Sequence, residues 1–311
     1  MVDRNDVDWR GYWPASLTPF TEGGQDVDDD ELRRLLRWYL SQGMHGVLVN
    51  GSTGEWYVQT DAERRRVAGI AVDELSGTVP VVIGCTTYRA EDTIELARHA
   101  RDIGADGILS SPPPYMRPQP EEIYAFFAAI SDAVDIPIMV YNWPPGTNVD
   151  IGPELAGRLA DIPNVVAIKD STFNTAQFYR TLLTVRDRLR VFGNFLSPLG
   201  IEVYSSLGGD GFIGGGMMLG SEEPEFFEAM WRGDFDRAGE IAAREMLWIT
   251  LLYDPDLTPK FGWGQIKAAM RLLGQPVGYT RLPMLPLTDQ ARLSALRRVL
   301  GQASLLDQEL V

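Results

Sequence analysis

Val165-Val166-Ala167-Ile168-Lys169-Asp170 is the stretch that decides the fold: four consecutive apolar residues end in a lysine and an aspartate. A short apolar run bounded by polar residues is typical of a strand buried on both faces, as in a parallel sheet. Helical patterns, with apolar residues three and four positions apart, flank it at 152–160 and 175–187. The stretch therefore predicts one strand-then-helix unit of an α/β protein.

The same unit recurs along the chain. Strands are expected at 14–20, 46–50, 79–84, 107–110, 137–141, 165–169, 190–193 and 211–214. Helices are expected at 29–42, 61–75, 90–103, 120–133, 152–160, 175–187, 198–207 and 223–231. Eight units within about 230 residues predict a (β/α)8 TIM barrel, because a doubly wound sheet usually stops at five or six strands.

The strand pattern ends after residue 231, which predicts two parts. Residues 1–232 are expected to form the (β/α)8 barrel with the catalytic centre. Residues 233–311 are expected to form a C-terminal helical extension packed on the barrel, with three helices at 236–252, 260–273 and 289–300.

Composition excludes several classes of function. The chain has 311 residues, and 28 Lys+Arg against 43 Asp+Glu give a net charge of −15, so nucleic acid and anionic membranes are not expected partners. No apolar stretch approaches the ~20 residues of a membrane span. The polar, acidic N-terminus does not fit a secretory signal, which favours a cytoplasmic location. A single cysteine, Cys85, and two histidines, His45 and His99, leave no metal site and no Ser-His triad to expect.

Lys169 is the most informative residue at the predicted carboxyl ends of the strands, where barrel enzymes place their chemistry. The chain has three lysines, and the other 25 of its 28 cations are arginine. A guanidinium is not deprotonated in proteins, whereas a desolvated ammonium can lose its proton and attack a carbonyl. Lys169 is therefore a candidate nucleophile; the alternative is a lysine paired with a nearby carboxylate.

Two further candidates follow neighbouring strands. Tyr141 ends the preceding strand, and its phenol is expected beside Lys169, where it could move protons through the hydroxyl of Ser52 or Thr53. The turn Gly51-Ser52-Thr53-Gly54-Glu55 offers hydroxyls and backbone N–H groups suited to a carboxylate. The alternatives are a core tyrosine and a plain glycine turn. Cys85 also lies at a strand end, but neither histidine is placed to activate it, and a small buried residue is the favoured interpretation.

These motifs together resemble the dihydrodipicolinate synthase and N-acetylneuraminate lyase family, and the resemblance covers nearly the whole chain. The motifs that carry it are Leu17-Thr18-Pro19-Phe20, Gly51-Ser52-Thr53-Gly54-Glu55, Ser111-Pro112-Pro113-Pro114-Tyr115, Tyr141-Asn142-Trp143-Pro144, Ile168-Lys169-Asp170 and Arg281-Leu282-Pro283-Met284. The resemblance implies a lyase that joins a lysine to pyruvate or another 2-oxo acid as a Schiff base.

By this resemblance each candidate has a role. Lys169 is the Schiff-base residue, and no metal or other cofactor is implied beyond the covalent imine. Tyr141 relays protons with Thr53, and Tyr115 reaches a neighbouring subunit of a homotetramer. Ser52 and Thr53 hold the substrate carboxylate. The backbone carbonyl of Ile213 lines the pocket.

Two departures from the family pattern predict the far end of the substrate. Gly146 stands where the lysine-pathway synthases carry an arginine, and Gly193 is followed by Asn194 where sialate lyases carry an acidic pair. With Trp143 and Phe195 near these positions, the distal pocket is expected to be apolar.

Three activities remain open. The sequence predicts an aldolase or dehydratase whose 2-oxo acid has one carboxylate and a weakly polar far end. The alternatives are 4-hydroxy-tetrahydrodipicolinate synthase activity on pyruvate and aspartate semialdehyde, with Arg117 as the nearest replacement cation, and a non-catalytic sensor of 2-oxo acids.

Overall fold

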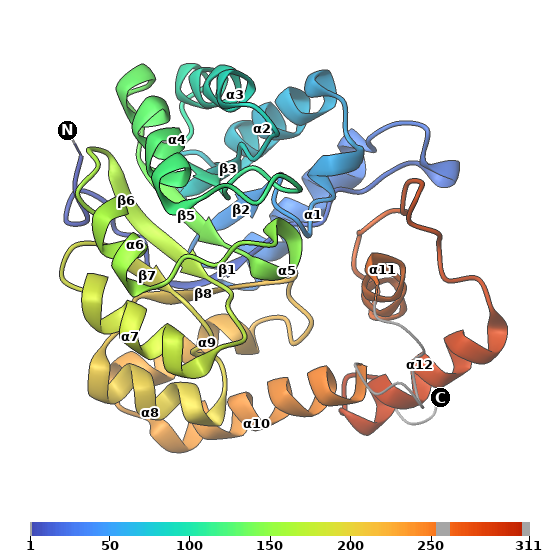
Figure 1. Ribbon diagram of the computed structural model, residues 1–311. Helices are drawn as coiled ribbons and strands as arrows, with labels where there is room; N and C mark the ends of the chain where they lie inside the picture. The colour runs from blue at the N-terminus through green and yellow to red at the C-terminus, as the bar shows by residue number, and fades with distance from the viewer. Residues whose placement is uncertain (1, 253–261, 307–311) are drawn as a thin grey trace.

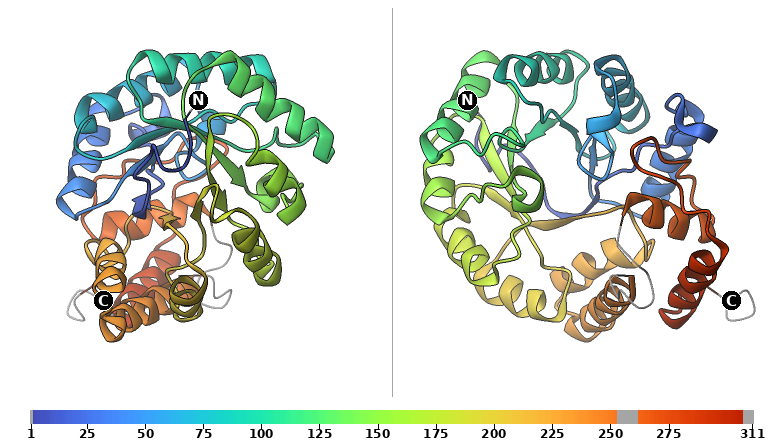
Figure 2. Two further views of the ribbon diagram at one scale, coloured as in Figure 1. Left: turned by 90° about the vertical axis from the view of Figure 1, so that its left-hand side faces the viewer. Right: turned by 45° about the vertical axis from the view of Figure 1, so that its right-hand side comes forward.

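A ring of eight parallel strands surrounded by helices forms the body of the protein (Figures 1 and 2). The computed structural model describes residues 2–252 and 262–306. The strands are β1 Gly11–Pro14, β2 Val47–Val49, β3 Val81–Gly84, β4 Gly107–Ser110, β5 Ile138–Asn142, β6 Val165–Asp170, β7 Arg190–Phe192 and β8 Gly211–Gly214. They are ordered β1-β8-β7-β6-β5-β4-β3-β2, and a parallel bridge between Ala15 and Leu48 joins the two ends of the sheet. The predicted (β/α)8 barrel is confirmed.

Helices alternate with the strands and cover the outside of the barrel. They are α1 Asp29–Ser41, α2 Asp61–Leu75, α3 Ala90–Asp102, α4 Pro120–Ala133, α5 Pro144–Thr147, α6 Pro153–Leu159, α7 Thr175–Val185, α8 Pro198–Leu207 and α9 Glu222–Arg232. Local chemistry sets several starts. At the start of α2, the Thr60 side chain accepts a hydrogen bond from the backbone N–H of Glu63. The Glu63 carboxylate in turn accepts one from the backbone N–H of Thr60. The four-residue helix α5 was not expected from the sequence, nor were the short 3-10 helices at Glu22–Gly24 and Trp56–Val58.

The first strand is the one clear error of the sequence-based assignment. It was expected at 14–20 and lies at Gly11–Pro14. Residues 15–20 are all buried, so their burial resembles that of a strand. However, the segment leaves the sheet after Ala15, which makes only an isolated bridge with Leu48, and Pro19 has no N–H to donate to a ladder. The aromatic pair Tyr12-Trp13 supplies the strand instead.

The alternation of side chains along β5 and β6 brings the candidate residues to the inside. Met139 and Ala167 belong to the cluster that fills the barrel interior, together with Trp13 and Phe192. Side chains two residues apart point to the same face of a strand. Tyr141 on β5 and Lys169 on β6 follow Met139 and Ala167 at this spacing, so both emerge from the core toward the mouth of the barrel.

Three C-terminal helices follow the barrel: α10 Phe235–Leu252, α11 Trp263–Leu272 and α12 Gln290–Gln302. The helix expected at 260–273 begins at Trp263, and residues 260–261 lie outside the described residues. Figure 1 shows α11 and α12 beside the barrel, reached by the long α10. Lys267 of α11 forms a buried ion pair with Glu55, which follows β2, at 2.6 Å between Nζ and Oε1.

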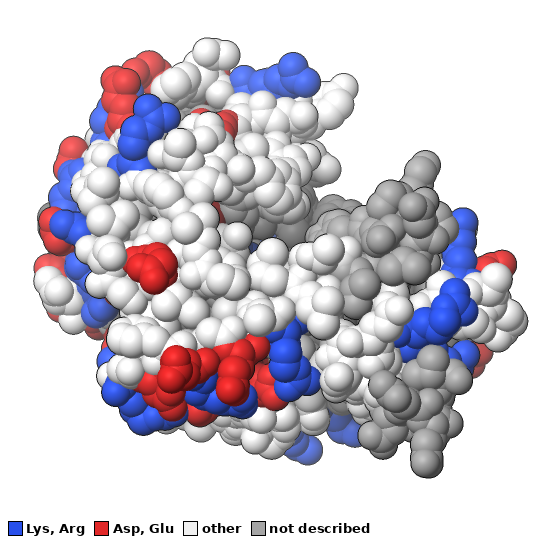
Figure 3. All heavy atoms as spheres, turned by 90° about the horizontal axis from the view of Figure 1, so that it is seen from below, with Lys and Arg blue, Asp and Glu red and all other residues white. Residues whose placement is uncertain are grey.

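Charged side chains of both signs alternate on the outer surface. Figure 3 shows acidic and basic residues side by side toward the edges of the face in view, while its middle is mostly uncharged. Many form exposed pairs, such as Arg237 with Glu240. Among the described helices, none combines the length and apolar character required to span a bilayer.

Candidate active site

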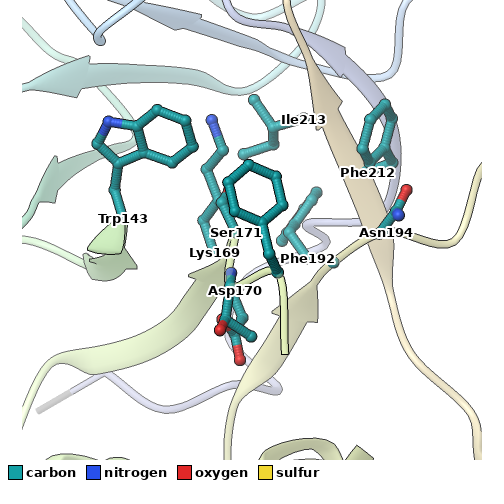
Figure 4. A pocket seen from close by; sticks show the side chains of 11 residues that line it. Trp143, Lys169, Asp170, Ser171, Phe192, Asn194, Phe212 and Ile213 are labelled. Atoms are coloured by element: carbon teal, nitrogen blue, oxygen red, sulfur yellow. The ribbon is translucent and has the colours of Figure 1, made fainter. Parts of the chain in front are cut away.

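The Lys169 side chain lies at the carboxyl end of β6, between the neighbouring strands. The register places Lys169 opposite Tyr141 of β5 and Phe192 of β7. The residue is only 8% exposed, and Nζ lies 4.6 Å from the centroid of the Tyr141 ring. Figure 4 shows the amine pointing into a cavity between Trp143 and Ile213.

The surroundings of Lys169 favour its neutral form. Within the described residues, no carboxylate lies within ion-pair distance of Nζ, so the alternative interpretation as a paired lysine has no support. Burial lowers the pKa of Lys169 to about 7 because water can no longer solvate the ammonium. Near pH 7, a substantial fraction of this amine is therefore free to attack a carbonyl.

The adjacent acid, Asp170, is occupied elsewhere. Its carboxylate is directed away from the Lys169 amine (Figure 4) and accepts hydrogen bonds from Asn142 Nδ2 at 2.9 Å and the Thr172 N–H at 3.1 Å. Burial raises the pKa of Asp170 to about 6. Asp170 thus belongs to a polar network that connects β5 with β6 and does not hold the amine as an ammonium.

Tyr141 is buried beside the amine as a protonated phenol. Burial raises the pKa of Tyr141 well above its usual range, although hydrogen bonds with the side chains of Ser52 and Ser171 oppose this rise. Its ring lies nearly parallel to the indole of Trp143, with centroids 6.1 Å apart and 12° between the planes. The phenol can therefore donate a proton to a bound substrate and needs an assisting hydroxyl to take one back.

The turn after β2 is held from several sides. The Gly54 carbonyl accepts from Thr18 Oγ1 and from Gln59 Nε2, both at 2.7 Å. Glu55 has φ of 55° and ψ of 39°, in the left-handed region, and its carboxylate meets Lys267. These contacts present Ser52 to the cavity beside Tyr141. Thr53 is buried in the same turn but lines neither of the two cavities described next.

Two adjacent cavities open at the mouth of the barrel, and Trp143 lines both. The first, of about 200 Å³, is lined by Trp143, Lys169, Asp170, Ser171, Thr172, Phe173, Phe192, Gly193, Asn194, Phe212 and Ile213. The second, of about 350 Å³, is lined by Gly51, Ser52, Trp56, Tyr57, Thr86, Tyr88, Leu109, Ser111, Pro114, Tyr141, Trp143, Gly146 and Thr147. The structure thus places Lys169, Gly193, Asn194 and Ile213 around one cavity and Ser52, Tyr141 and Gly146 around the other.

Other expected residues lie outside these cavities. Tyr115 is 87% exposed, with φ of 79°, on the loop between β4 and α4. Arg117 on the same loop is exposed and lines neither cavity. Phe195 was expected near the distal pocket, which is wrong: it is fully buried, with ring centroids 5.5 Å from Phe178 and 5.4 Å from Tyr204. After Gly193 the Phe195 side chain points away from the barrel mouth, and its ring packs against Phe178 of α7 and Tyr204 of α8.

Sequence reasoning missed the aromatic lining of the Lys169 cavity. Phe173 follows β6 and Phe212 lies on β8, and both contact this cavity. The signal for Phe173 was its position just after a strand, within the loops that form the mouth. Phe212 gave no comparable signal, because a single aromatic residue in a short strand usually belongs to the core.

The structure does not support a catalytic cysteine, and its described residues offer no metal site. Cys85 is buried, and burial raises the pKa of its thiol to about 12, which leaves it unreactive near neutral pH. In the described part of the chain, no three His, Cys, Asp or Glu side chains are grouped to hold a metal ion. The Lys169 amine therefore remains the candidate nucleophile of the site.

A closed parallel barrel has, at its carboxyl end, a buried lysine amine with no ion-pair partner among the described residues, which is typical of an aldolase-type barrel enzyme. The sequence comparison is more specific: the chain belongs to the dihydrodipicolinate synthetase family, whose model matches residues 8–303. It is a lyase of this family, of the Schiff-base-forming kind that acts on pyruvate or a related 2-oxo acid. The family resemblance inferred from the motifs is thereby confirmed.

Relatives and solved structures agree with this placement. The 4-hydroxy-tetrahydrodipicolinate synthase of Phenylobacterium zucineum is 36% identical over 93% of this chain and 95% of its own. The dihydrodipicolinate synthase structure from Thermotoga maritima has a TM-score of 0.86, with 30% identity over 96% of this chain and 100% of its own. YagE, a prophage protein from Escherichia coli K12 in complex with pyruvate, has a TM-score of 0.86, with 29% identity over 96% of this chain and 100% of its own.

Proposed function

We propose that Lys169 forms the imine with a 2-oxo acid and that the enzyme acts as an aldolase or dehydratase. The observation that carries this proposal is the buried Lys169 amine, which has a lowered pKa and no carboxylate partner among the described residues. A solvated lysine with an ordinary pKa would be almost fully protonated at neutral pH and a poor nucleophile.

The chemistry balances without a redox partner. The amine adds to the keto carbon, water leaves, and a protonated imine results. In the aldolase direction, the C4 hydroxyl loses its proton and the C3–C4 bond breaks; its electron pair forms an enamine, and an aldehyde departs. Protonation of C3 and hydrolysis of the imine release pyruvate. The protonated imine provides the driving force, because it accepts electrons better than a ketone does.

We assign the remaining roles as follows. Tyr141 donates and accepts the substrate protons with help from Ser52 and Thr53, whose turn holds the carboxylate through backbone N–H groups. The Ile213 carbonyl, Gly193 and Asn194 line the space around the substrate. Tyr115, exposed in one chain, completes the site of a neighbouring subunit in a homotetramer. Residues 1–232 form the barrel unit, and residues 233–311 form the helical extension.

Borohydride trapping tests the proposal. Incubation with pyruvate and borohydride, followed by peptide mass spectrometry, is expected to show the reduced pyruvate adduct on Lys169. Absence of an adduct would remove the imine mechanism. Pyruvate binding without an adduct would instead favour the sensor interpretation.

Synthase activity is the second candidate, because the relative from Phenylobacterium zucineum carries the name 4-hydroxy-tetrahydrodipicolinate synthase. Against it, neither cavity contains an arginine to bind the carboxylate of aspartate semialdehyde, and Arg117 lies outside both. Assay of pyruvate with aspartate semialdehyde separates the two. Efficient turnover would favour the synthase, whereas slow turnover would support a weakly polar second substrate.

The rate of imine formation is expected to rise with pH through about 7. The neutral amine is the reactive form, and the pKa of Lys169 is lowered to about 7, so the rate increases as the ammonium deprotonates and then levels off. Trapping with cyanoborohydride across pH 5.5–9, read by intact mass, measures this midpoint. A rate still rising above pH 9 would show that the amine keeps an ordinary pKa.

Replacing Tyr141 with phenylalanine is expected to lower kcat by about 10²–10⁴-fold, the usual contribution of a positioned proton donor. Loss of the phenol removes proton transfer but leaves the Lys169 amine in place, so the pyruvate adduct should still form. Steady-state kinetics and trapping on the same preparation distinguish these steps. Loss of kcat together with complete loss of the adduct would assign Tyr141 to imine formation itself.

A further inference from the structure

The indole of Trp143 occupies the space above Gly146. A Cβ built on Gly146 would lie 2.3 Å from Trp143 Cδ1 and 2.4 Å from Nε1, closer than real side chains approach one another. The glycine at 146 and the tryptophan at 143 therefore depend on each other, and no larger side chain fits at 146 while the indole keeps this position.

The backbone holds Trp143 in this orientation. Trp143 precedes two prolines that begin α5, and its carbonyl accepts hydrogen bonds from the N–H groups of Gly146 and Thr147 and from Thr147 Oγ1, each at 3.0 Å. Its ring also stacks on Tyr141. The indole is therefore held in place as a common wall of the two cavities.

Aromatic rings form most of the apolar wall around the Lys169 amine. Trp143, Phe173, Phe192 and Phe212 line this cavity, and Phe173 meets Trp143 edge to face with ring centroids 6.5 Å apart. Phe173 is 84% exposed at the rim. Contact between the exposed Phe173 ring and a bound apolar ligand would remove apolar surface from water, which favours binding.

The charges around the cavity exclude an anionic far end. Lys169 is the only cationic residue that lines either described cavity, and the acidic Asp170 lies at the wall of the first. A second carboxylate on the substrate would lose its hydration here without gaining a cation. A flat apolar group loses nothing comparable and can stack on the rings.

We propose that Trp143, with Phe173, forms a subsite for a planar aromatic group at the far end of the 2-oxo acid. The substrate class is then a 4-aryl-4-hydroxy-2-oxo acid, whose C3–C4 cleavage gives pyruvate and an aromatic aldehyde. This proposal rests on the proposed function for the 2-oxo acid end of the substrate. The aryl preference itself is a separate property of the cavity wall.

Binding of three 2-oxo acids by calorimetry tests the subsite without turnover. 4-Phenyl-2-oxobutanoate is expected to bind at least tenfold tighter than 2-oxobutanoate, and 2-oxoglutarate weaker than either. Trp143→Ala should reduce the ratio of the affinities for 4-phenyl-2-oxobutanoate and 2-oxobutanoate at least fivefold. Trp143→Phe, which keeps a flat ring, should retain most of this ratio. Gly146→Ala, which displaces the indole by one added carbon, should resemble Trp143→Ala.

Each outcome decides the proposal. Equal affinities for 4-phenyl-2-oxobutanoate and 2-oxobutanoate would overturn the aromatic subsite. Tighter binding of 2-oxoglutarate than of 4-phenyl-2-oxobutanoate would also overturn it. An unchanged ratio in Trp143→Ala would do the same. A phenyl preference without a trapped adduct on Lys169 would refute the imine mechanism and leave the subsite standing, whereas an adduct without phenyl preference would do the reverse.

Discussion

Replacing Lys169 with arginine is expected to abolish turnover, with a loss of at least about 10⁴-fold, the scale seen when a covalent nucleophile is removed. Arginine keeps a cation at the end of β6 but cannot form an imine, so charge and nucleophilicity are separated in one substitution. The measurement is pyruvate release or consumption together with borohydride trapping. Residual activity within tenfold of wild type would show that the amine does not act as a nucleophile.

Lys169→Met is the matched control for folding. Methionine has a similar length and needs no solvation, so this variant should be inactive and at least as stable as the wild type. The pKa of Lys169 is lowered in the folded state, so between about pH 7 and its ordinary range the unfolded chain binds more protons. Wild-type stability should therefore rise relative to Lys169→Met as pH increases through that window. Thermal unfolding at pH 6.5 and 9 measures this difference.

Replacing Lys267 with methionine is expected to cost roughly 3–5 kcal/mol of stability, because it leaves the Glu55 carboxylate buried without its partner. Glu55 is fully buried and Lys267 is 2% exposed. Burial raises the pKa of Glu55, and Lys267 opposes this rise. Lys267 Nζ also donates to the carbonyls of Thr18 and Tyr279, both at 2.7 Å. The Tm should fall by roughly 10 °C for a chain of this size.

A double variant separates the ion pair from general packing. Lys267→Met combined with Glu55→Gln removes the stranded charge, so it should be more stable than Lys267→Met alone. Arg98→Met breaks an exposed pair with Glu95 and should leave the Tm close to wild type. Because Glu55 ends the turn that presents Ser52, Lys267→Met should also raise the KM for pyruvate. A Tm and KM unchanged from wild type would refute this role of the pair.

Helices and strands were predictable wherever the local pattern of apolar residues matched the burial of the element. The run before Lys169 has the length and composition of a buried strand, and β6 is found there at Val165–Asp170. The same reasoning failed at residues 16–20, which follow the carboxyl end of β1 and are buried against the turn after β2 and helix α11, where Thr18 contacts Gly54 and Lys267. An apolar pattern indicates burial, but it does not show what provides the hydrogen bonds of the buried backbone.

The sequence by itself determined the barrel, the family motifs and the placement of Lys169 beside Tyr141, because consecutive strands of a parallel barrel are neighbours and side chains alternate along them. Only the tertiary structure decided that Trp143 lies over Gly146, that Phe195 turns into the core, and that Lys267 pairs with Glu55 across 212 residues. The first contact depends on the exact geometry of one short turn, and the other two join side chains of separate loops and helices. Their geometry depends on how whole elements pack, which no local period encodes.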